Sequence, residues 1–192
     1  MSNFFNYMSR MKYIERWSLM RNTVKENIME HSEQVAQIAH ALAVIRNRLY
    51  GGVIDTLKVL GLAIFHEASE VLTGDLPTPI KYHNTDIKNA YKNLEKLAND
   101  RLLDMLPDEL REDYSEIFKP DISSAEYRIV KAADKLSAYL KCIEELRSGN
   151  SEFKRAKAII EDELKKIDMP EVKYFMDKFI PSFKKSLDEM EK

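Results

Sequence analysis

Residues 55–79 read DTLKVLGLAIFHEASEVLTGDLPTP, and this stretch decides the fold class of the chain. From Val59 it continues with Ala63, His66 and Glu70 at spacings of four, three and four residues, which is the spacing of one face of an α-helix. An aspartate precedes the pattern as a helix N-cap, and a glycine and two prolines end it as a stiff, polar loop. The inward face of this predicted helix therefore carries ionisable side chains at its C-terminal end.

The same helical spacing continues along most of the 192 residues, and no segment combines strict alternation with hairpin turn signals. Beyond the stretch above, we predict helices over residues 3–14, 29–50, 84–105, 107–118, 123–147, 151–167 and 170–190, the last kinked near Pro181. Residues 15–27 lack an apolar stripe and are predicted to be a connection. With 44% hydrophobic residues, 5 Gly and 6 Pro, we expect an all-α fold, with residues 1–192 forming a single compact helical domain.

The composition excludes several function classes. Lys and Arg number 30 against 32 Asp and Glu, so the charge of -2 attracts neither a nucleic-acid polymer nor an anionic membrane. No stretch approaches the roughly 20 apolar residues of a membrane span, and the N-terminus does not resemble a signal peptide. Cys142 is the single cysteine and cannot form an internal disulfide, which favours a reducing compartment. We therefore expect a cytoplasmic protein.

Two of the four histidines lie on buried faces of predicted helices. His31 lies one turn before Val35 in the 29–50 helix, and His66 lies on the face described above. A buried histidine is usually a core residue with a satisfied hydrogen bond, whereas two histidines with carboxylates can hold a metal ion. For each histidine taken alone, both interpretations stay open.

The stretch HEASE, residues 66–70, places two carboxylates within about one helical turn of an imidazole. In a helix, residues 66 and 70 are neighbours, so a metal ligand and a general base can share this turn. The zinc-protease motif H-E-x-x-H is excluded, because Glu70 replaces its second histidine. The di-iron pattern Glu-x-x-His is also excluded, because Ile28 and Ala63 stand where glutamates are needed.

Two further positions carry ionisable groups that need an explanation. Asp134 lies among apolar and small residues of a predicted helix, where a salt bridge with Lys131 or Lys135 and a role as metal ligand both account for it. Arg16 offers a bidentate phosphate donor beside the flat ring of Trp17. Packing on the surface is the alternative for that pair.

The order of His31, His66 followed by an acid, and a distant Asp134 resembles the H…HD…D signature of the HD superfamily, whose ligands converge from separate helices onto one divalent metal. The likeness to bacterial YfbR-type 5'-deoxynucleotidases is more specific and extends from about residue 4 to 188. It is carried by the segments Ile14–Trp17, Glu30–Ser32, Ala68–Pro79 and Ala138–Cys142.

This resemblance implies a role for each matching position. The metal ligands would be His31, His66, Glu67 and Asp134, and Glu70 would be the catalytic carboxylate. The substrate-binding residues would be Arg16 and Trp17 at the phosphate, Asp75, Leu76, Pro77 and Thr78 at the nucleoside, and also Glu67. The resemblance further implies a homodimer that acts on deoxyribonucleoside 5'-monophosphates and discriminates against ribonucleotides. A mixed imidazole and carboxylate shell admits one divalent transition metal ion, namely Mn, Fe, Co, Cu or Zn.

One position departs from the superfamily signature. Glu67 replaces the usual aspartate, and the extra methylene adds roughly 1.5 Å of reach. Glutamate remains a good ligand for divalent ions, although a displacement of about 1 Å in an active site can cost on the order of a hundredfold in rate. Two alternatives follow: an HD phosphohydrolase acting on nucleoside triphosphates or cyclic nucleotides, and a non-catalytic nucleotide sensor in which Glu67 has abolished turnover.

Overall fold

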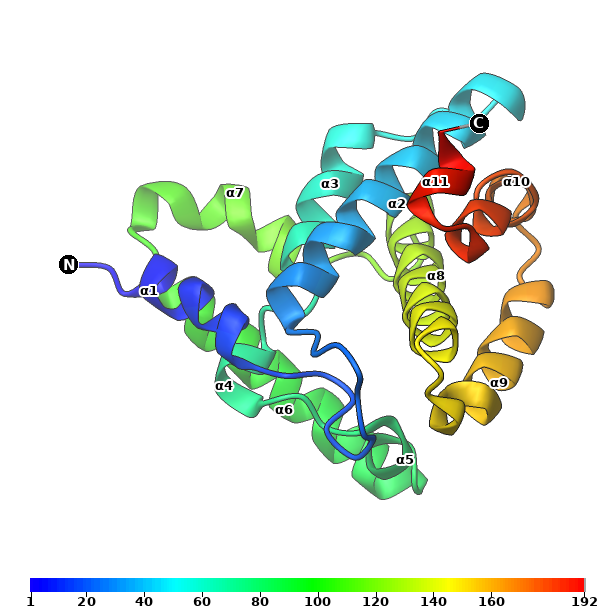
Figure 1. The fold of residues 1–192 in the computed structure, drawn as a ribbon. Coiled ribbons are helices and arrows are strands. Elements are labelled where there is room, and N and C mark those ends of the chain that lie inside the picture. Colours follow the sequence, from blue (N-terminus) through cyan, green and yellow to red (C-terminus); the bar gives the residue numbers. More distant parts are fainter. Residues whose placement is uncertain (192) are drawn as a thin grey trace.

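The computed structural model describes residues 1–191, and this part of the chain is helical, without β-strands (Figure 1). The elements are α1 (Phe4–Met8), η1 (Ser9–Tyr13), α2 (Ile28–Leu49), α3 (Thr56–Phe65), α4 (Glu70–Thr73), α5 (Thr78–Lys81), α6 (Thr85–Asp104), α7 (Asp108–Phe118), α8 (Ala125–Arg147), η2 (Ser151–Phe153), α9 (Lys154–Lys165), α10 (Pro170–Lys178), η3 (Ile180–Lys184) and α11 (Leu187–Met190), where η marks a 3-10 helix. The predicted all-α fold is confirmed.

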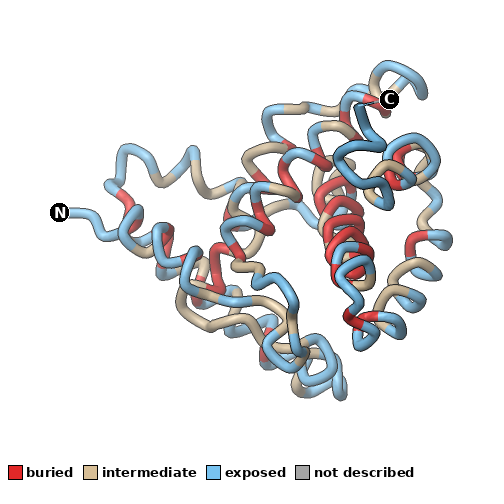
Figure 2. The backbone as a smooth tube through the Cα atoms, viewed as in Figure 1, coloured by how far each residue is buried: buried red, intermediate tan, exposed pale blue. Residues whose placement is uncertain are grey.

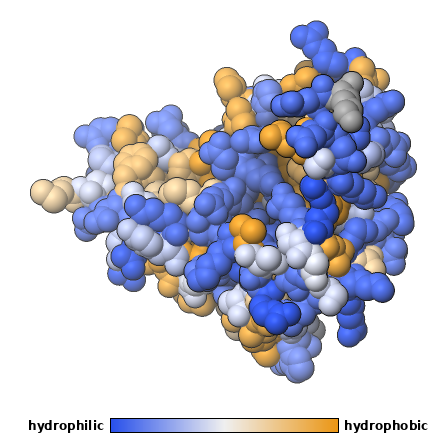
Figure 3. Space-filling view, viewed as in Figure 1, coloured by the Kyte–Doolittle hydropathy of each residue, from blue (hydrophilic) through white to orange (hydrophobic). Residues whose placement is uncertain are grey.

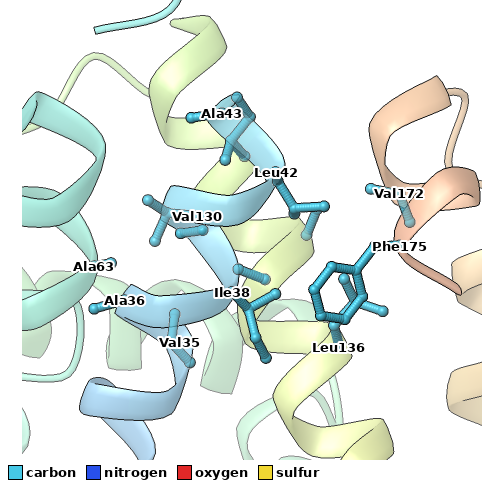
Figure 4. Close-up of a cluster of buried hydrophobic side chains, with 14 of the residues drawn as sticks. Val35, Ala36, Ile38, Leu42, Ala43, Ala63, Val130, Leu136, Val172 and Phe175 are labelled. Atoms are coloured by element: carbon cyan, nitrogen blue, oxygen red, sulfur yellow. The ribbon is translucent and has the colours of Figure 1, made fainter. Parts of the chain in front are cut away.

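Helices α2, α3, α8 and α10 enclose the larger hydrophobic cluster. In Figure 4, Ala36 of α2 and Ala63 of α3 face one another, and such small side chains let two helices approach closely. Leu136 of α8 and Phe175 of α10 fill the space on the other side of α2. Figure 2 shows α8 buried along most of its length, so this helix is the central element of the fold.

A second cluster holds α1 against α6 and α7. Phe4 is fully buried, and its ring lies 5.7 Å from that of Phe118 at the end of α7. Ile28, the first residue of α2, belongs to this cluster, whereas Val35 on the same helix belongs to the larger one. Helix α2 therefore connects the two clusters.

Local capping explains where the main helices begin. Asp55 accepts hydrogen bonds from the amides of Leu57 and Lys58, and Ser124 accepts one from the amide of Tyr127. Gly51 has a φ of 64° just after α2, a conformation that glycine adopts without strain. These starts and this stop agree with the sequence predictions.

Among the predicted segments that differ from the structure are the first helix, the loop before residue 79 and the last helix. The first helix changes to a 3-10 helix at Ser9. The loop before residue 79 contains the start of the short helix α5. The helix predicted over 170–190 is broken into α10, η3 and α11 rather than kinked, because Pro181 has no amide hydrogen to continue α10.

Most of the face in Figure 3 is covered by hydrophilic side chains, in line with the 32% of charged residues. No helix within residues 1–191 has the length and apolar character that crossing a membrane requires.

Candidate metal centre and active site

Four side chains from three parts of the fold meet at the C-terminal end of α3. His31 comes from the first turn of α2, His66 and Glu67 directly follow α3, and Asp134 lies in the middle of α8. One ligand atom from each lies within 4.8 Å of the others. The structure thus brings together all four positions at which the resemblance implies metal binding, and we call them the four-residue cluster.

The spacing of the donor atoms fits one small cation. His31 Nε2 is 3.1 Å from Asp134 Oδ1 and 3.3 Å from His66 Nε2. His66 Nε2 is 3.4 Å from Glu67 Oε1. Ligand atoms that each lie about 2.1 Å from a metal are about 3.0 to 3.4 Å apart at octahedral or tetrahedral angles. These three distances lie in that range, and the 3.9 Å between His66 Nε2 and Asp134 Oδ1 is somewhat longer. The donor set therefore fits a divalent ion, and the longer side chain of Glu67 reaches the cluster.

Both imidazoles have a partner on Nδ1, the nitrogen that faces away from the cluster. His66 Nδ1 is 2.7 Å from the carbonyl oxygen of Ala63, and His31 Nδ1 is 3.1 Å from Ser137 Oγ. Such partners orient a ligating histidine. Burial lowers the pKa of His66, which favours the neutral ring that binds a metal. Each ring is held with Nε2 toward the cluster.

The backbone from 66 to 70 is not the continuous helix that the sequence predicts. α3 ends at Phe65 and α4 begins only at Glu70. Between them the amides of Ala68 and Glu70 bond carbonyls three residues earlier, at 2.9 and 3.0 Å. In a continued α-helix the carbonyl of Ala63 would accept from the amide of residue 67, but it is bonded by the ring of His66 and, more weakly at 3.5 Å, by the amide of His66. The prediction was wrong because a side chain competes for a backbone acceptor.

This tighter turn joins Glu70 to Glu67. Glu70 is 3% exposed and shares a side-chain hydrogen bond with Glu67. Burial, followed by the charge of Glu67, raises the pKa of Glu70 to about 10. Burial also acts to raise the pKa of Glu67, but the charge of His66 and the hydrogen bond from Glu70 outweigh burial and lower the pKa of Glu67. Glu70 is therefore the stronger base of the two carboxyl groups.

Asp134 combines the two interactions that the sequence left open. Its Oδ1 lies against His31, and its Oδ2 accepts from Lys131 Nζ at 3.2 Å. Burial acts to raise the pKa of Asp134, but Lys131 and His31 hold it well below its usual value. Lys135 pairs with Glu163 on α9 instead. The Asp134 carboxylate is thus both salt-bridged and part of the cluster.

Arg16 and Trp17 lie next to the cluster rather than only on the surface. Arg16 Nη1 donates to Glu26 Oε2 at 2.7 Å and lies 2.8 Å from His31 Nδ1. Trp17 Nε1 donates to the same oxygen of Glu26 at 3.2 Å, and its ring lies 5.3 Å from that of Phe153. Trp17 has a φ of 60°, a strained conformation for any residue but glycine. The pair is held in one defined conformation.

Sequence reasoning did not find Glu26 or Ser137. Glu26 lies in a segment without periodicity, so no spacing rule pairs it with Arg16. Ser137 lies one turn after Asp134 on α8, and that three-residue spacing was a signal that could have found it.

The segment from Asp75 to Thr78 runs from a loop into α5. Asp75, Leu76 and Pro77 are half-buried, whereas Thr78 is exposed. Burial raises the pKa of Asp75, and the charge of Arg16 opposes this effect. Asp75 is therefore within electrostatic range of Arg16.

A cavity of about 770 Å³ opens beside the cluster. His66 and Glu67 form part of its wall. Lysine and tyrosine side chains of α5, α6 and α8 also line it, among them Lys81, Tyr91 and Lys131. Neither Arg16 nor the Asp75–Thr78 segment lines this cavity. Its volume is that of a small-molecule site, and it reaches His66 and Glu67 from the side of α6.

Comparison with known proteins identifies the family. Residues 3–183 match the family described as 5'-deoxynucleotidase YfbR-like. The chain belongs to the YfbR-like 5'-deoxynucleotidase family. This YfbR-like chain is 53% identical over 193 residues to the 5'-deoxynucleotidase of Shewanella oneidensis, with 100% of this chain and 99% of the relative covered. The family and the enzyme class predicted from the motifs are confirmed.

Solved structures share the fold of this YfbR-like chain. An HD-domain phosphohydrolase from Listeria innocua matches with a TM-score of 0.83 at 22% identity, covering 94% of this chain and 88% of that one. The HD phosphohydrolase of cyanophage S-2L, described as bound to dA and one catalytic Zn²⁺, matches with a TM-score of 0.68 at 19% identity and covers 94% and 96%. The expected HD-domain fold is confirmed.

Proposed function

We propose that this chain hydrolyses deoxyribonucleoside 5'-monophosphates to the deoxyribonucleoside and phosphate, with the help of one divalent transition metal ion. The observation that carries the proposal is the convergence of four donor atoms within 4.8 Å, next to a buried carboxyl group of raised pKa, in a member of the YfbR-like family. The names of the relatives support this substrate class.

His31, His66, Glu67 and Asp134 would hold the ion. Two imidazoles and two carboxylates leave positions for substrate and water, as a catalytic site requires. A divalent ion bound there supplies Lewis acidity toward the phosphoryl group and makes water more acidic. Because a protein of the same fold contains one catalytic Zn²⁺, zinc is the first ion to test.

Glu70 would accept the proton of the attacking water. Beside an uncompensated Glu67 the raised pKa keeps Glu70 protonated, so Glu70 would act as a base only once a bound divalent ion offsets the charge of Glu67 and the Glu70 carboxyl group has lost its proton. The proton held on Glu70 is then available to the departing 5'-oxygen. Glu70 lies next to the cluster without being one of its four donors, which suits a proton carrier.

Arg16 and Trp17 would bind and orient the phosphate. The guanidinium keeps its positive charge near the cluster through Glu26, and a planar donor matches phosphate oxygens. Asp75, Leu76, Pro77 and Thr78 would contact the nucleoside. A site closed around the sugar rejects an added 2'-hydroxyl by steric exclusion.

We also propose that residues 1–192 act as one HD-type domain, since α2 contributes to both hydrophobic clusters. The resemblance supports a homodimer, and the single buried Cys142 suits the cytoplasm. A monomeric mass in solution would refute the dimer.

The test is phosphate release from dAMP and from AMP by metal-stripped protein, with Mn²⁺, Co²⁺, Cu²⁺, Zn²⁺ or Mg²⁺ added back singly. We expect release that depends on the metal and is much faster from dAMP. No release from dAMP with any of these ions would refute the proposed function. Equal rates for dAMP and AMP would refute discrimination at the sugar.

A further inference from the structure

Residues 15–27, here called the arginine loop, connect η1 to α2 and are closed at their base. The amide of Arg16 donates to the carbonyl of Glu26 at 2.9 Å, and that of Ile28 donates to the carbonyl of Ile14 at 3.0 Å. Arg16 and Trp17 lie at this closed base, beside His31. The far end of the loop must be held by other contacts.

Glu145 of α8 holds the far end. This side chain is 1% exposed, and its carboxylate accepts from Thr23 N at 2.8 Å, Thr23 Oγ1 at 2.6 Å and Val24 N at 3.2 Å. Lys141 Nζ lies 2.5 Å from the same carboxylate and also donates to the carbonyl of Val24, while Asn150 donates at 2.8 Å. Burying two charges costs free energy unless they are paired and fully hydrogen-bonded. Here most of the hydrogen bonds that offset this cost go to the arginine loop.

Glu145 and Lys141, here called the anchor, lie on the same face of α8 as the cluster residue Asp134. Asp134, Ser137, Lys141 and Glu145 follow at spacings of three, four and four residues along α8. The eleven residues from Asp134 to Glu145 correspond to about 16 Å along the helix axis. Glu145 is therefore too far away to touch reacting atoms, but a rigid helix fixes its position relative to the cluster.

The conformation of Trp17 needs such support. Its positive φ persists only when surrounding contacts impose it. The carbonyl of Trp17 accepts from the amide of Met20, and the next residue, Arg21, is tied to Asn150 through its carbonyl at 2.6 Å. A continuous series of contacts therefore connects Glu145, through Asn150 and Arg21, to Trp17.

We propose that Glu145, paired with Lys141, is a positioning residue that holds Arg16 and Trp17 in register with the four-residue cluster. The part that concerns phosphate binding rests on the proposed function. The part that concerns the loop does not, because Trp17 is the single tryptophan and its fluorescence reports on the loop directly.

The experiment compares Glu145→Gln with Glu144→Gln, which removes the same charge from an exposed neighbour on α8. Three quantities are measured: acrylamide quenching of Trp17, Zn²⁺ affinity by calorimetry, and KM and kcat for dAMP. For Glu145→Gln we expect quenching to increase at least about twofold, KM to rise, and kcat/KM to fall by about 10- to 100-fold, as a displaced phosphate donor implies. Zn²⁺ affinity should stay within about threefold, and Glu144→Gln should match wild type.

A cycle with Arg16→Ala tests whether the effect passes through the arginine loop. In that background Glu145→Gln should lose most of its effect on kcat/KM, since two changes that act through one group are not additive. Full additivity would overturn the proposal. So would equal quenching in the two glutamine variants, or a loss of Zn²⁺ affinity as large as the loss of activity.

Should Glu145→Gln fail to fold, Thr23→Val replaces it. Thr23 is an exposed loop residue, so removing its hydroxyl leaves the core intact and should change quenching and KM in the same direction by a smaller factor. Unchanged quenching in folded Thr23→Val would then overturn the proposal. If wild type itself does not hydrolyse dAMP, the proposed function is refuted. Acrylamide quenching of Trp17 then still tests whether Glu145 holds the arginine loop in place.

Discussion

Ser137→Ala tests whether Ser137 orients His31 as a metal ligand. Ser137 is fully buried, its hydroxyl is 3.1 Å from His31 Nδ1, and it donates to Gln34 at 2.6 Å. Removing a partner of this kind from a ligating histidine typically lowers metal affinity by about 10- to 100-fold, or about 1.4 to 2.7 kcal/mol. Because Gln34 also loses its donor, the free energy of unfolding should fall by about 1 to 3 kcal/mol. Zn²⁺ calorimetry and urea unfolding of metal-free protein measure the two effects.

Ser32→Ala is the matched control. Ser32 is the next residue after His31, is 3% exposed, and has a hydroxyl without a hydrogen-bond partner among residues 1–191. Its removal should leave Zn²⁺ affinity unchanged and the free energy of unfolding unchanged or higher by up to about 1 kcal/mol. If Ser137→Ala and Ser32→Ala bind Zn²⁺ equally well, His31 is not a ligand oriented by Ser137.

Three further outcomes follow from the structure. Glu70→Gln should keep Zn²⁺ affinity within about tenfold while kcat for dAMP falls by about 10²- to 10⁴-fold, and near-normal kcat would remove Glu70 from proton transfer. Burial raises the pKa of Cys142 to about 12, so little thiolate exists at pH 8, and a thiol reagent should label folded protein only at the rate of unfolding; fast labelling would contradict this. Burial acts to raise the pKa of Glu145, but the hydrogen bonds from Lys141 and Thr23 lower it below its usual value. The stability that it contributes is therefore present above about pH 4.3 and is lost at lower pH. The gap between the unfolding free energies of wild type and Glu145→Gln should narrow as the pH falls below about 5 and keep narrowing past pH 3, and a constant gap from pH 5 to pH 3 would refute the charge effect.

The parts of the fold predicted correctly are those that depend on local chemistry. Asp55 and Ser124 cap helices because their side chains reach amides two or three residues away, and such bonds are visible in a short window of sequence. The break after Phe65 depends instead on which hydrogen-bond donor takes the carbonyl of Ala63, and a periodicity rule contains no information about that competition.

The residues of the candidate site also fall into those that local sequence patterns predict and those that they do not. His31 and His66 were identified as buried ionisable residues from their helical positions, and the family resemblance completed the set with Glu67 and Asp134. Glu26 could not be predicted, because its contact with Arg16 is formed by an irregular loop that closes only in the folded chain.

The spacing of the four-residue cluster in the sequence has a consequence for folding. His31 and Asp134 are 103 residues apart, so an unfolded chain has no preformed site and an ion held by all four residues binds only the native arrangement. At a free concentration of 100 times its dissociation constant, such an ion adds about 2.7 kcal/mol to the free energy of unfolding. For a chain of this length that corresponds to a rise of about 5 to 10 °C in the melting temperature. The concentration of free metal would then determine the stability of the folded protein as well as its catalytic rate.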